Sequence, residues 1–146
     1  SIGCNLKIRE FELSGDFNMS RGLNTDPNSG PIAHIPPNLG KIEIRKNLDR
    51  WELILFCIYS GFKDSSRFDD AGVDNLDETP LSSDISSEWH GLPSWWTLNY
   101  AATYKASNKV QINIGVDNIL DRHYKTFGSG ISAAGRSFLF STKYNF

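Results

Sequence analysis

The residues of this sequence best suited to metal or proton chemistry are its three histidines, His34, His90 and His123. Imidazole is the commonest protein ligand for transition metals and titrates near neutral pH. All three histidines lie in segments expected to connect strands, and no second ligand stands near them at a spacing typical of a metal site. We therefore expect exposed polar side chains at these positions, with no bound metal and no cofactor.

Catalytic chemistry is not expected either. A hydrolytic site needs a nucleophile, a base and a group that orients the base, held in fixed geometry. No Ser-His-Asp set can be assembled on strands here, because every histidine falls in a predicted loop. Cys4 and Cys57 lie on predicted strands that are not neighbours, so a disulfide is not expected. The sequence predicts that the protein is not an enzyme.

The segment from Lys63 to Glu88 is strongly acidic and carries only two basic residues, Lys63 and Arg67. It lacks the alternating ligand spacing of a calcium-binding loop. A solvated, mobile surface loop is the favoured interpretation, and a lid over a bound ligand is the functional alternative. Its acidic residues are Asp64, Asp69, Asp70, Asp74, Asp77, Glu78, Asp84 and Glu88.

The elements that must position these residues are β-strands, because apolar residues recur at every second position and not at helical spacing. Between Val110 and Asp117 the even-numbered residues are apolar, whereas the odd-numbered ones are Gln, Asn, Gly and Asp. A change of parity after Ile8 predicts a tight turn or bulge at Arg9 and Glu10. Seven strands are predicted: one ending near Ile8, then 11–19, 39–46, 51–62, 96–105, 110–117 and 137–146.

The predicted connections alternate between short and long. Those near Arg9, at 47–50 and at 107–109 are short, whereas 24–37, 63–94 and 122–135 are long. Short turns at one end and long loops at the other are typical of outer-membrane barrels, which have short periplasmic turns and long extracellular loops. We thus predict an all-β fold, an antiparallel up-and-down meander of about seven strands that forms part of a transmembrane β-barrel.

Aromatic residues gather near both ends of the predicted strands, as in the two interfacial belts of a membrane barrel. Polar residues of the opposite parity are expected to face a water-filled lumen. The predicted belt residues are Trp51, Tyr59, Trp95, Trp96, Tyr104, Tyr144 and Phe146. The predicted lumen residues are Glu12, Asp16, Asn99, Thr103, Gln111, Asn113 and Lys143.

The composition agrees with this class and excludes several others. The chain has 146 residues, a net charge of −2, and 39% hydrophobic residues, nine of them Phe. This apolar content excludes a disordered chain, and the absence of a basic excess argues against nucleic acid as a partner. No stretch approaches the roughly 20 apolar residues of a transmembrane helix.

Alternation alone also allows a soluble β-sandwich, in which the same apolar faces meet in a buried core. Such a protein could be an all-β ligand-binding module of the carbohydrate-binding type. Trp89, Trp95 and Trp96 would then form a surface on which sugars stack. Strands of ten to twelve residues and the very long 63–94 loop argue against this alternative, because sandwich strands are short and closely spaced.

The last third of the chain resembles the C-terminal end of TonB-dependent outer-membrane receptors. An aromatic-rich strand and a short turn lead to Asn118-Ile119-Leu120-Asp121 with Tyr124, and a Gly-rich loop ending at Arg136 leads to a last strand that finishes in Phe146. The segment from Arg21-Gly22 to Ile35-Pro36-Pro37 resembles the preceding part of the same family. Ala134 stands where the family usually has Pro.

This resemblance implies that residues 1–146 are the C-terminal portion of a barrel of about 22 strands, without the plug domain or the N-terminal barrel strands. It implies a fragment of a bacterial outer-membrane receptor that imports a metal chelate such as a ferric siderophore, haem or cobalamin. The implied partners are outer-membrane lipid, the plug, and the TonB complex through the N-terminal part. Phe146 and Tyr144 resemble the family's terminal insertion signal.

The resemblance also bears on the loops. Family members that take up haem bind its iron through extracellular histidines, so the loop candidates for substrate binding are His90 with Trp89, His123 with Tyr124, and His34. The acidic 63–88 loop could bridge to lipopolysaccharide through divalent cations.

Overall fold

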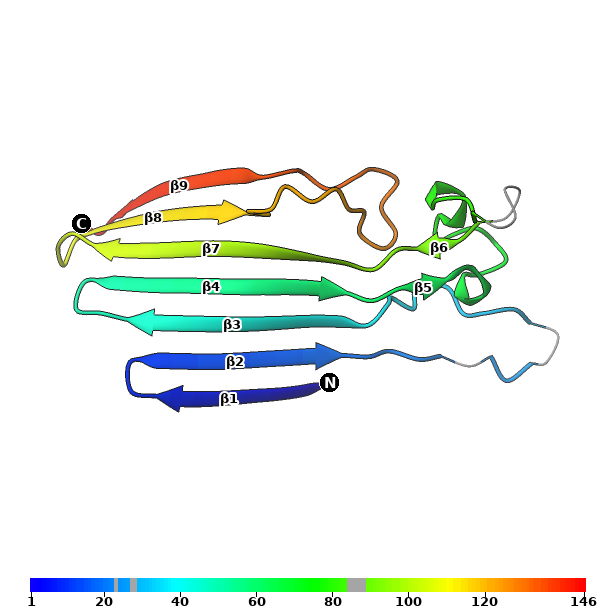
Figure 1. Ribbon diagram of the computed structural model, residues 1–146, viewed down its shortest axis with the longest axis horizontal. Coiled ribbons are helices and arrows are strands. Elements are labelled where there is room, and N and C mark those ends of the chain that lie inside the picture. The colour runs from blue at the N-terminus through cyan, green and yellow to red at the C-terminus, as the bar shows by residue number, and fades with distance from the viewer. Residues whose placement is uncertain (23, 27–28, 84–88) are drawn as a thin grey trace.

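The computed structural model describes residues 1–22, 24–26, 29–83 and 89–146. Seven long strands form one antiparallel sheet in the order β1-β2-β3-β4-β7-β8-β9, which is an up-and-down meander (Figure 1). The predicted all-β meander is therefore confirmed. The seven strands are β1 Ile2–Ile8, β2 Phe11–Asn18, β3 Leu39–Asn47, β4 Trp51–Ser60, β7 Trp95–Lys105, β8 Val110–Asp117 and β9 Ser137–Tyr144.

The remaining elements are short and all belong to the long connection between β4 and β7. Two of them, β5 Lys63–Asp64 and β6 Gly91–Leu92, pair antiparallel as a separate two-stranded sheet. The other two are the 3-10 turns η1 Ser65–Arg67 and η2 Leu76–Glu78. Across the described ranges, no helix is long and apolar enough to cross a membrane.

The two ends of the sheet differ, as the loop lengths predicted. Three short turns lie at one end, whereas the long connections 19–38, 61–94 and 118–136 extend from the other (Figure 1). The first turn consists of Arg9 and Glu10, with Arg9 in the left-handed region at φ 54°. The third turn is held by the Ser107 hydroxyl, which accepts the N–H groups of Lys109 and Val110. Such side-chain acceptors stabilise tight turns.

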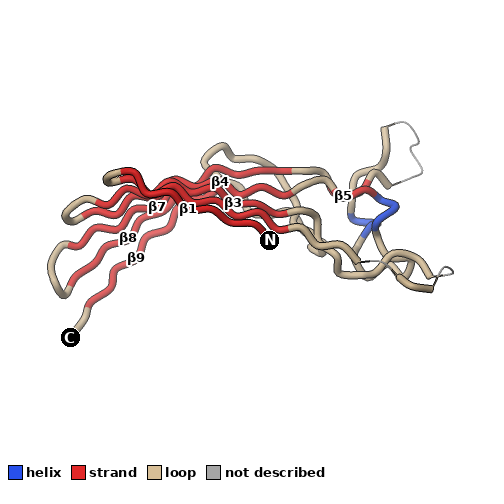
Figure 2. Tube along the Cα trace, turned by 90° about the horizontal axis from the view of Figure 1, so that it is seen from below, coloured by secondary structure: helices blue, strands red, loops and turns tan. Residues whose placement is uncertain are grey.

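The large sheet is one curved layer, and the long loops extend beyond the ends of its strands (Figure 2). Among the described residues, few apolar side chains are buried, and they are Pro37, Phe68, Leu92 and Ala102. The other large apolar residues of the sheet are exposed or half-buried, among them Ile42, Leu55 and Phe140. A soluble sandwich would bury these side chains between two sheets. In the described structure no second sheet covers them, so their apolar surface remains available for contact with another molecule or medium.

The sheet is open, with β1 at one edge and β9 at the other. Along each of these edge strands, one row of backbone N–H and C=O groups has no ladder partner in the described structure. Unpaired backbone groups cost several kcal/mol each in hydrocarbon, which is why strands cross membranes only in closed barrels.

Candidate functional site

The candidate site is the sheet itself, which presents two chemically different faces. Directly paired residues of antiparallel strands project to the same side, so the register assigns every strand residue to a face. The row Leu6, Leu13, Ile44, Leu55, Tyr100, Val116 and Phe138 crosses all seven strands with apolar or aromatic side chains. We call this side the apolar face, and the opposite side the polar face.

Aromatic side chains occupy both ends of the apolar face. At the short-turn end, the rings of Trp51 and Tyr104 stack at 4.6 Å, and Tyr144 contacts Phe146 at 5.1 Å. At the long-loop end, Tyr59 pairs with Trp96 across the two central strands. Amphipathic rings at both ends of an apolar band are the arrangement expected at two lipid–water interfaces.

Trp95, predicted together with Trp96 as a belt residue, lies on the polar face. It pairs with Ser60 in a row that contains Leu39 and Asn18. Adjacent strand residues point to opposite sides, so the two tryptophans cannot share one belt. Trp95 instead stacks on Tyr124 at 4.2 Å, and we do not group it with the interfacial aromatics.

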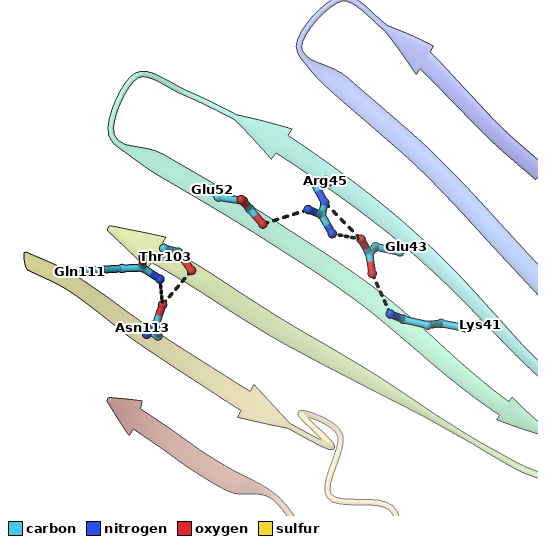
Figure 3. Close-up of polar contacts among 7 residues, drawn as sticks. All are labelled: Lys41, Glu43, Arg45, Glu52, Thr103, Gln111 and Asn113. Atoms are coloured by element: carbon cyan, nitrogen blue, oxygen red, sulfur yellow. Dashed lines mark hydrogen bonds and ion pairs between the residues drawn. The ribbon is translucent and has the colours of Figure 1, made fainter. Parts of the chain in front are cut away.

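A chain of ion pairs runs along the polar face on β3 and β4 (Figure 3). Glu43 lies between Lys41 at 2.8 Å and Arg45 at 2.9 Å, and Arg45 continues to Glu52 at 3.1 Å. Lys7 and Glu12 extend the charged surface to β1 and β2. This arrangement suits a face in contact with water or with a polar protein surface, and it could not face hydrocarbon.

On β7 and β8, uncharged polar groups continue the same face (Figure 3). The Asn113 side-chain oxygen accepts the Thr103 hydroxyl at 3.0 Å and the Gln111 amide at 2.8 Å, and the Asn113 amide donates to the Ser141 hydroxyl. All seven predicted lumen residues lie on this face.

One strip of the polar face departs from this pattern. Ile54, Phe56 and Ile58 of β4 project from it, which explains why β4 is apolar at nearly every position. The ammonium of Lys41 lies 4.9 Å from the centre of the Phe56 ring. Half-buried apolar side chains within a polar wall are typical of a surface that contacts another protein domain.

The three long connections meet in a cluster around one buried ion pair, Lys63–Asp74, which we call the loop cluster. The two side chains are 2.9 Å apart and each is only 1% exposed. The Lys63 ammonium lies 4.4 Å from the ring of Phe68 and 4.0 Å from that of Phe127, which belongs to the β8–β9 connection. Asp74 also accepts the backbone N–H of His34 from the β2–β3 connection. One ion pair thus ties together all three connections.

This order differs from the solvated, mobile loop expected from the acidic sequence, at least for residues 63–83. The Asp69 carboxylate accepts the N–H groups of Val73 and Asp74, and these bonds hold the pKa of Asp69 below its ordinary value. The Ser66 hydroxyl and N–H lower the pKa of Asp64 in the same way. Because both pKa values are depressed, both contributions are present at neutral pH and are lost only as the pH falls below the ordinary carboxyl range. Asp84 and Glu88 lie outside the described residues.

The Asn118–Asp121 segment links β8 to β9 through a compact turn. Asn118 is buried with φ 50°; its side chain accepts the N–H of Arg122 and donates to the Arg122 carbonyl, and its backbone N–H donates to the Asn99 side chain. Asp121 accepts the N–H of Arg136 at 2.7 Å, immediately before β9 begins. Asn tolerates the left-handed conformation better than other non-glycine residues, which explains its place here.

Gly135 permits this link, because a Cβ at that position would lie 2.6 Å from the Asp121 carboxylate. We expect Gly135→Ala to displace Asp121 from the Arg136 N–H and to destabilise the folded sheet by about 1–3 kcal/mol. The measurement is the urea midpoint of unfolding. Gly128→Ala is a control for glycine loss: its Cβ would meet nothing within 4 Å, although its φ of 74° adds some strain. Equal midpoints for Gly135→Ala and wild type would contradict this role of Gly135.

The structure does not bring the three histidines to one site. His34 is exposed beside Asp74, and the ring of His90 stacks on Phe62 at 4.9 Å. Trp89 forms an isolated bridge with Leu81. Within the described part of the chain, no group of three or more His, Cys, Asp or Glu residues could hold a metal ion. Cys4 and Cys57 are free thiols on strands that are not neighbours.

His123 and Tyr124 line a pocket of about 390 Å³ between the β6–β7 segment and the β8–β9 connection. Trp95 forms part of its wall, and its indole N–H is buried without a hydrogen-bond partner among the described residues. Lys125, held by the Glu78 carbonyl at 2.8 Å, adds a positive charge. A mostly apolar pocket with a few converging polar groups is the usual form of a small-molecule site.

Comparison with known proteins supports the fold. No family model and no curated protein sequence matches the chain. Among solved structures, the copper transporter OprC superposes with a TM-score of 0.79 at 14% identity, covering 99% of this chain and 22% of that protein. The siderophore receptor PirA from Acinetobacter baumannii superposes at 0.69 with 18% identity, covering 97% and 21%. A mutant of the ferric enterobactin receptor PfeA from Pseudomonas aeruginosa superposes at 0.67 with 14% identity, with the same coverage.

These neighbours are TonB-dependent receptors, which are transporters and not enzymes. The chain has the fold of a part of a TonB-dependent receptor barrel. It spans about a fifth of the length of the structures that it matches. In a receptor barrel the apolar face is the outer wall and the polar face lines the lumen, which accounts for the two chemistries of this sheet.

Proposed function

We propose that residues 1–146 form the C-terminal portion of the barrel domain of a TonB-dependent receptor in the bacterial outer membrane. The observation that carries this proposal is the single-layer sheet, apolar on one side and lined by ion pairs on the other. Lipid covers the apolar face and rings at both ends lie at the interfaces. The short turns face the periplasm and the loop cluster faces outward.

The open edges of β1 and β9 pair with further barrel strands that this chain does not contain. The polar face contacts water and the plug domain, and Ile54, Phe56 and Ile58 form the apolar part of the plug contact. The TonB complex acts through the N-terminal part of the receptor and uses the inner-membrane proton-motive force to displace the plug. The family resemblance and the structural neighbours support these partners.

The transported ligand is a metal or a metal chelate. Two of the structural neighbours are named as siderophore or enterobactin receptors and one as a copper transporter. Within this class, a ferric siderophore or haem suits the pocket beside Trp95 best. The stacked rings of Trp95 and Tyr124 offer an aromatic surface, and the Lys125 ammonium supplies a positive donor for an anionic or carbonyl-rich chelate.

The test uses the full-length receptor in outer-membrane vesicles, with ferric catecholate, ferric hydroxamate and haemin as probes. We expect Tyr124→Ala to weaken binding of one probe about tenfold, because an aromatic stacking contact is worth about 1–1.5 kcal/mol. Tyr144→Ala, at the opposite end of the sheet, is the control. If a probe binds the receptor and its affinity is unchanged by Tyr124→Ala, the pocket is not part of the ligand site. A receptor that stays soluble without detergent would overturn the proposed function itself.

The soluble carbohydrate-binding module has less support. That alternative needs the apolar residues to form a dry core under a second layer, and the described sheet leaves them open. Its proposed stacking surface is also divided, because Trp95 and Trp96 project to opposite sides.

A further inference from the structure

Two adjoining depressions of about 250 Å³ each lie on the polar face, toward the long-loop end. Phe56 on β4 and Asp117 on β8 line both of them. Only β7 lies between these two strands, so about 10 Å, two strand spacings, separates the two residues across the sheet. We call the combined space the Asp117 hollow. It has room for a small charged group between the ring and the carboxylate.

Small residues of the sheet create this space. Ala101 and Gly115 pair with each other on β7 and β8, and Leu139 on β9 stands beside them. Gly115 has no positive φ, and a Cβ there would meet its nearest atoms, in Leu139 and the Tyr100 carbonyl, at 3.5 Å. The backbone thus does not require glycine here, and a glycine inside a strand often marks a place where another molecule approaches closely.

The half-buried Asp117 carboxylate has neither a hydrogen bond nor an ion pair with any residue that the structure describes. The polar groups around it already have partners. The Asn99 side-chain oxygen accepts the N–H of Asn118, and Lys41 is held by Glu43 at 2.8 Å. Because a carboxylate that is partly removed from water gains from an opposite charge, Asp117 can receive a cation from outside this chain.

Aromatic rings border the same hollow. Phe56 lies on one side, and the stacked pair of Trp95 and Tyr124 lies at the long-loop end. The ammonium of Lys41 lies 4.9 Å from the centre of the Phe56 ring, so that ring already contacts one cation. Aromatic rings beside a carboxylate suit a guanidinium or ammonium group. Trp95 and Tyr124 also line the pocket that contains Lys125, so one ligand can reach both spaces.

We propose that the Asp117 hollow binds an organic cation, a guanidinium or primary ammonium group of the transported ligand. Asp117 pairs with the cation, and the rings of Phe56, Trp95 and Tyr124 contact it. Phe56 thereby stands between the plug contact and the ligand. The metal-binding part of the same ligand lies in the neighbouring pocket, where Lys125 offers the opposite charge. This inference rests on the proposed function and narrows it to chelates that also carry a basic group.

The test is ligand-observed NMR on the full-length receptor in detergent, with benzylguanidinium as the probe and benzylurea as its neutral analogue of similar shape. We expect wild type to bind benzylguanidinium about tenfold more tightly than benzylurea, because hydrogen bonds to a charged partner are the stronger ones. Asp117→Asn, which removes the charge and keeps the shape, should abolish this preference. Gly115→Val, which fills part of the hollow, should weaken binding of both probes.

Two substitutions on the same face but outside the hollow are the controls. Asp16→Asn removes a carboxylate on β2. Gly3→Val adds the same side chain at a glycine of β1, where a Cβ would meet only the Gly15 carbonyl, at 3.6 Å. Both controls should bind benzylguanidinium as wild type does. Heat-dependent gel migration first shows that each variant is folded.

Equal affinity of wild type for the two probes, or a preference that survives Asp117→Asn, would overturn the cation site. Failure of wild type to bind benzylguanidinium would overturn it too, and a lower urea midpoint of Asp117→Asn would then assign the cation to a side chain of the plug. In each of these cases the receptor function stands if a ferric probe still binds. Binding of benzylguanidinium by a receptor that takes up no metal chelate would support the cation site but overturn the proposed function.

Discussion

Phe140→Arg is expected to destabilise the barrel by about 2–4 kcal/mol, whereas Asn113→Arg should be tolerated. Phe140 is 72% exposed on the apolar face in the middle of β9, and its cross-strand partner is Ile114. An arginine there must place its charge in hydrocarbon. Asn113 lies on the neighbouring strand but on the polar face, where it bonds Thr103. The measurement is the free energy of unfolding of the full-length receptor in lipid vesicles.

Comparing substitutions on the two faces distinguishes contact with lipid from ordinary effects of packing on stability. Ile114→Arg, a second substitution on the apolar face, should behave as Phe140→Arg does, because Ile114 pairs with Ala102 and Phe140 and therefore lies at the same depth. In a soluble sheet, charge at an exposed position would change stability by only a few tenths of a kcal/mol. Equal tolerance on both faces would therefore show that no hydrocarbon contacts the apolar face.

Most of the fold could be predicted because it depends on two local features of the sequence. These are the alternation of apolar and polar residues along each strand and the positions of the turns. Strict alternation fixes which residues of a strand share a face, and the change of parity after Ile8 located the Arg9–Glu10 turn. The same reasoning separates Trp95 from Trp96, since neighbouring residues of a strand point to opposite sides. The belt prediction grouped the two by their position along the strand alone, although the signal for separating them was present in the sequence.

The loop cluster could not be predicted in this way. Lys63 and Asp74 belong to an acidic segment in which any carboxylate could pair with the lysine, and the partner depends on the path of the chain. Phe127, which covers the Lys63 ammonium, comes from a different connection. In the β8–β9 link, the Asn118–Asp121 motif could be recognised in the sequence. The close approach of Gly135 to Asp121 could not, because it is a tertiary contact. Irregular segments lack the two-residue periodicity from which the strands could be predicted.

Lys63→Met is expected to destabilise the loop cluster by about 3–5 kcal/mol, because it leaves the Asp74 carboxylate buried without its cation. The pair is 2.9 Å long with both side chains 1% exposed, and Phe68 and Phe127 exclude water from the ammonium. Hydrogen exchange of the three connections in the full-length receptor measures the local opening. Backbone amides in all three should exchange faster together, since Asp74 also holds the N–H of His34.

Two further variants distinguish a buried ion pair from a general effect of losing lysine. Lys125→Met removes the cation from a half-exposed pair with Glu78 in the same cluster, and should cost less than about 1 kcal/mol. Lys63→Met combined with Asp74→Asn removes both charges and keeps an acceptor for His34, so it should recover much of the lost protection. If the double variant opens as readily as Lys63→Met alone, the uncompensated carboxylate is not the cause. The shape of the lysine, packed between two rings, would then be what unites the three connections.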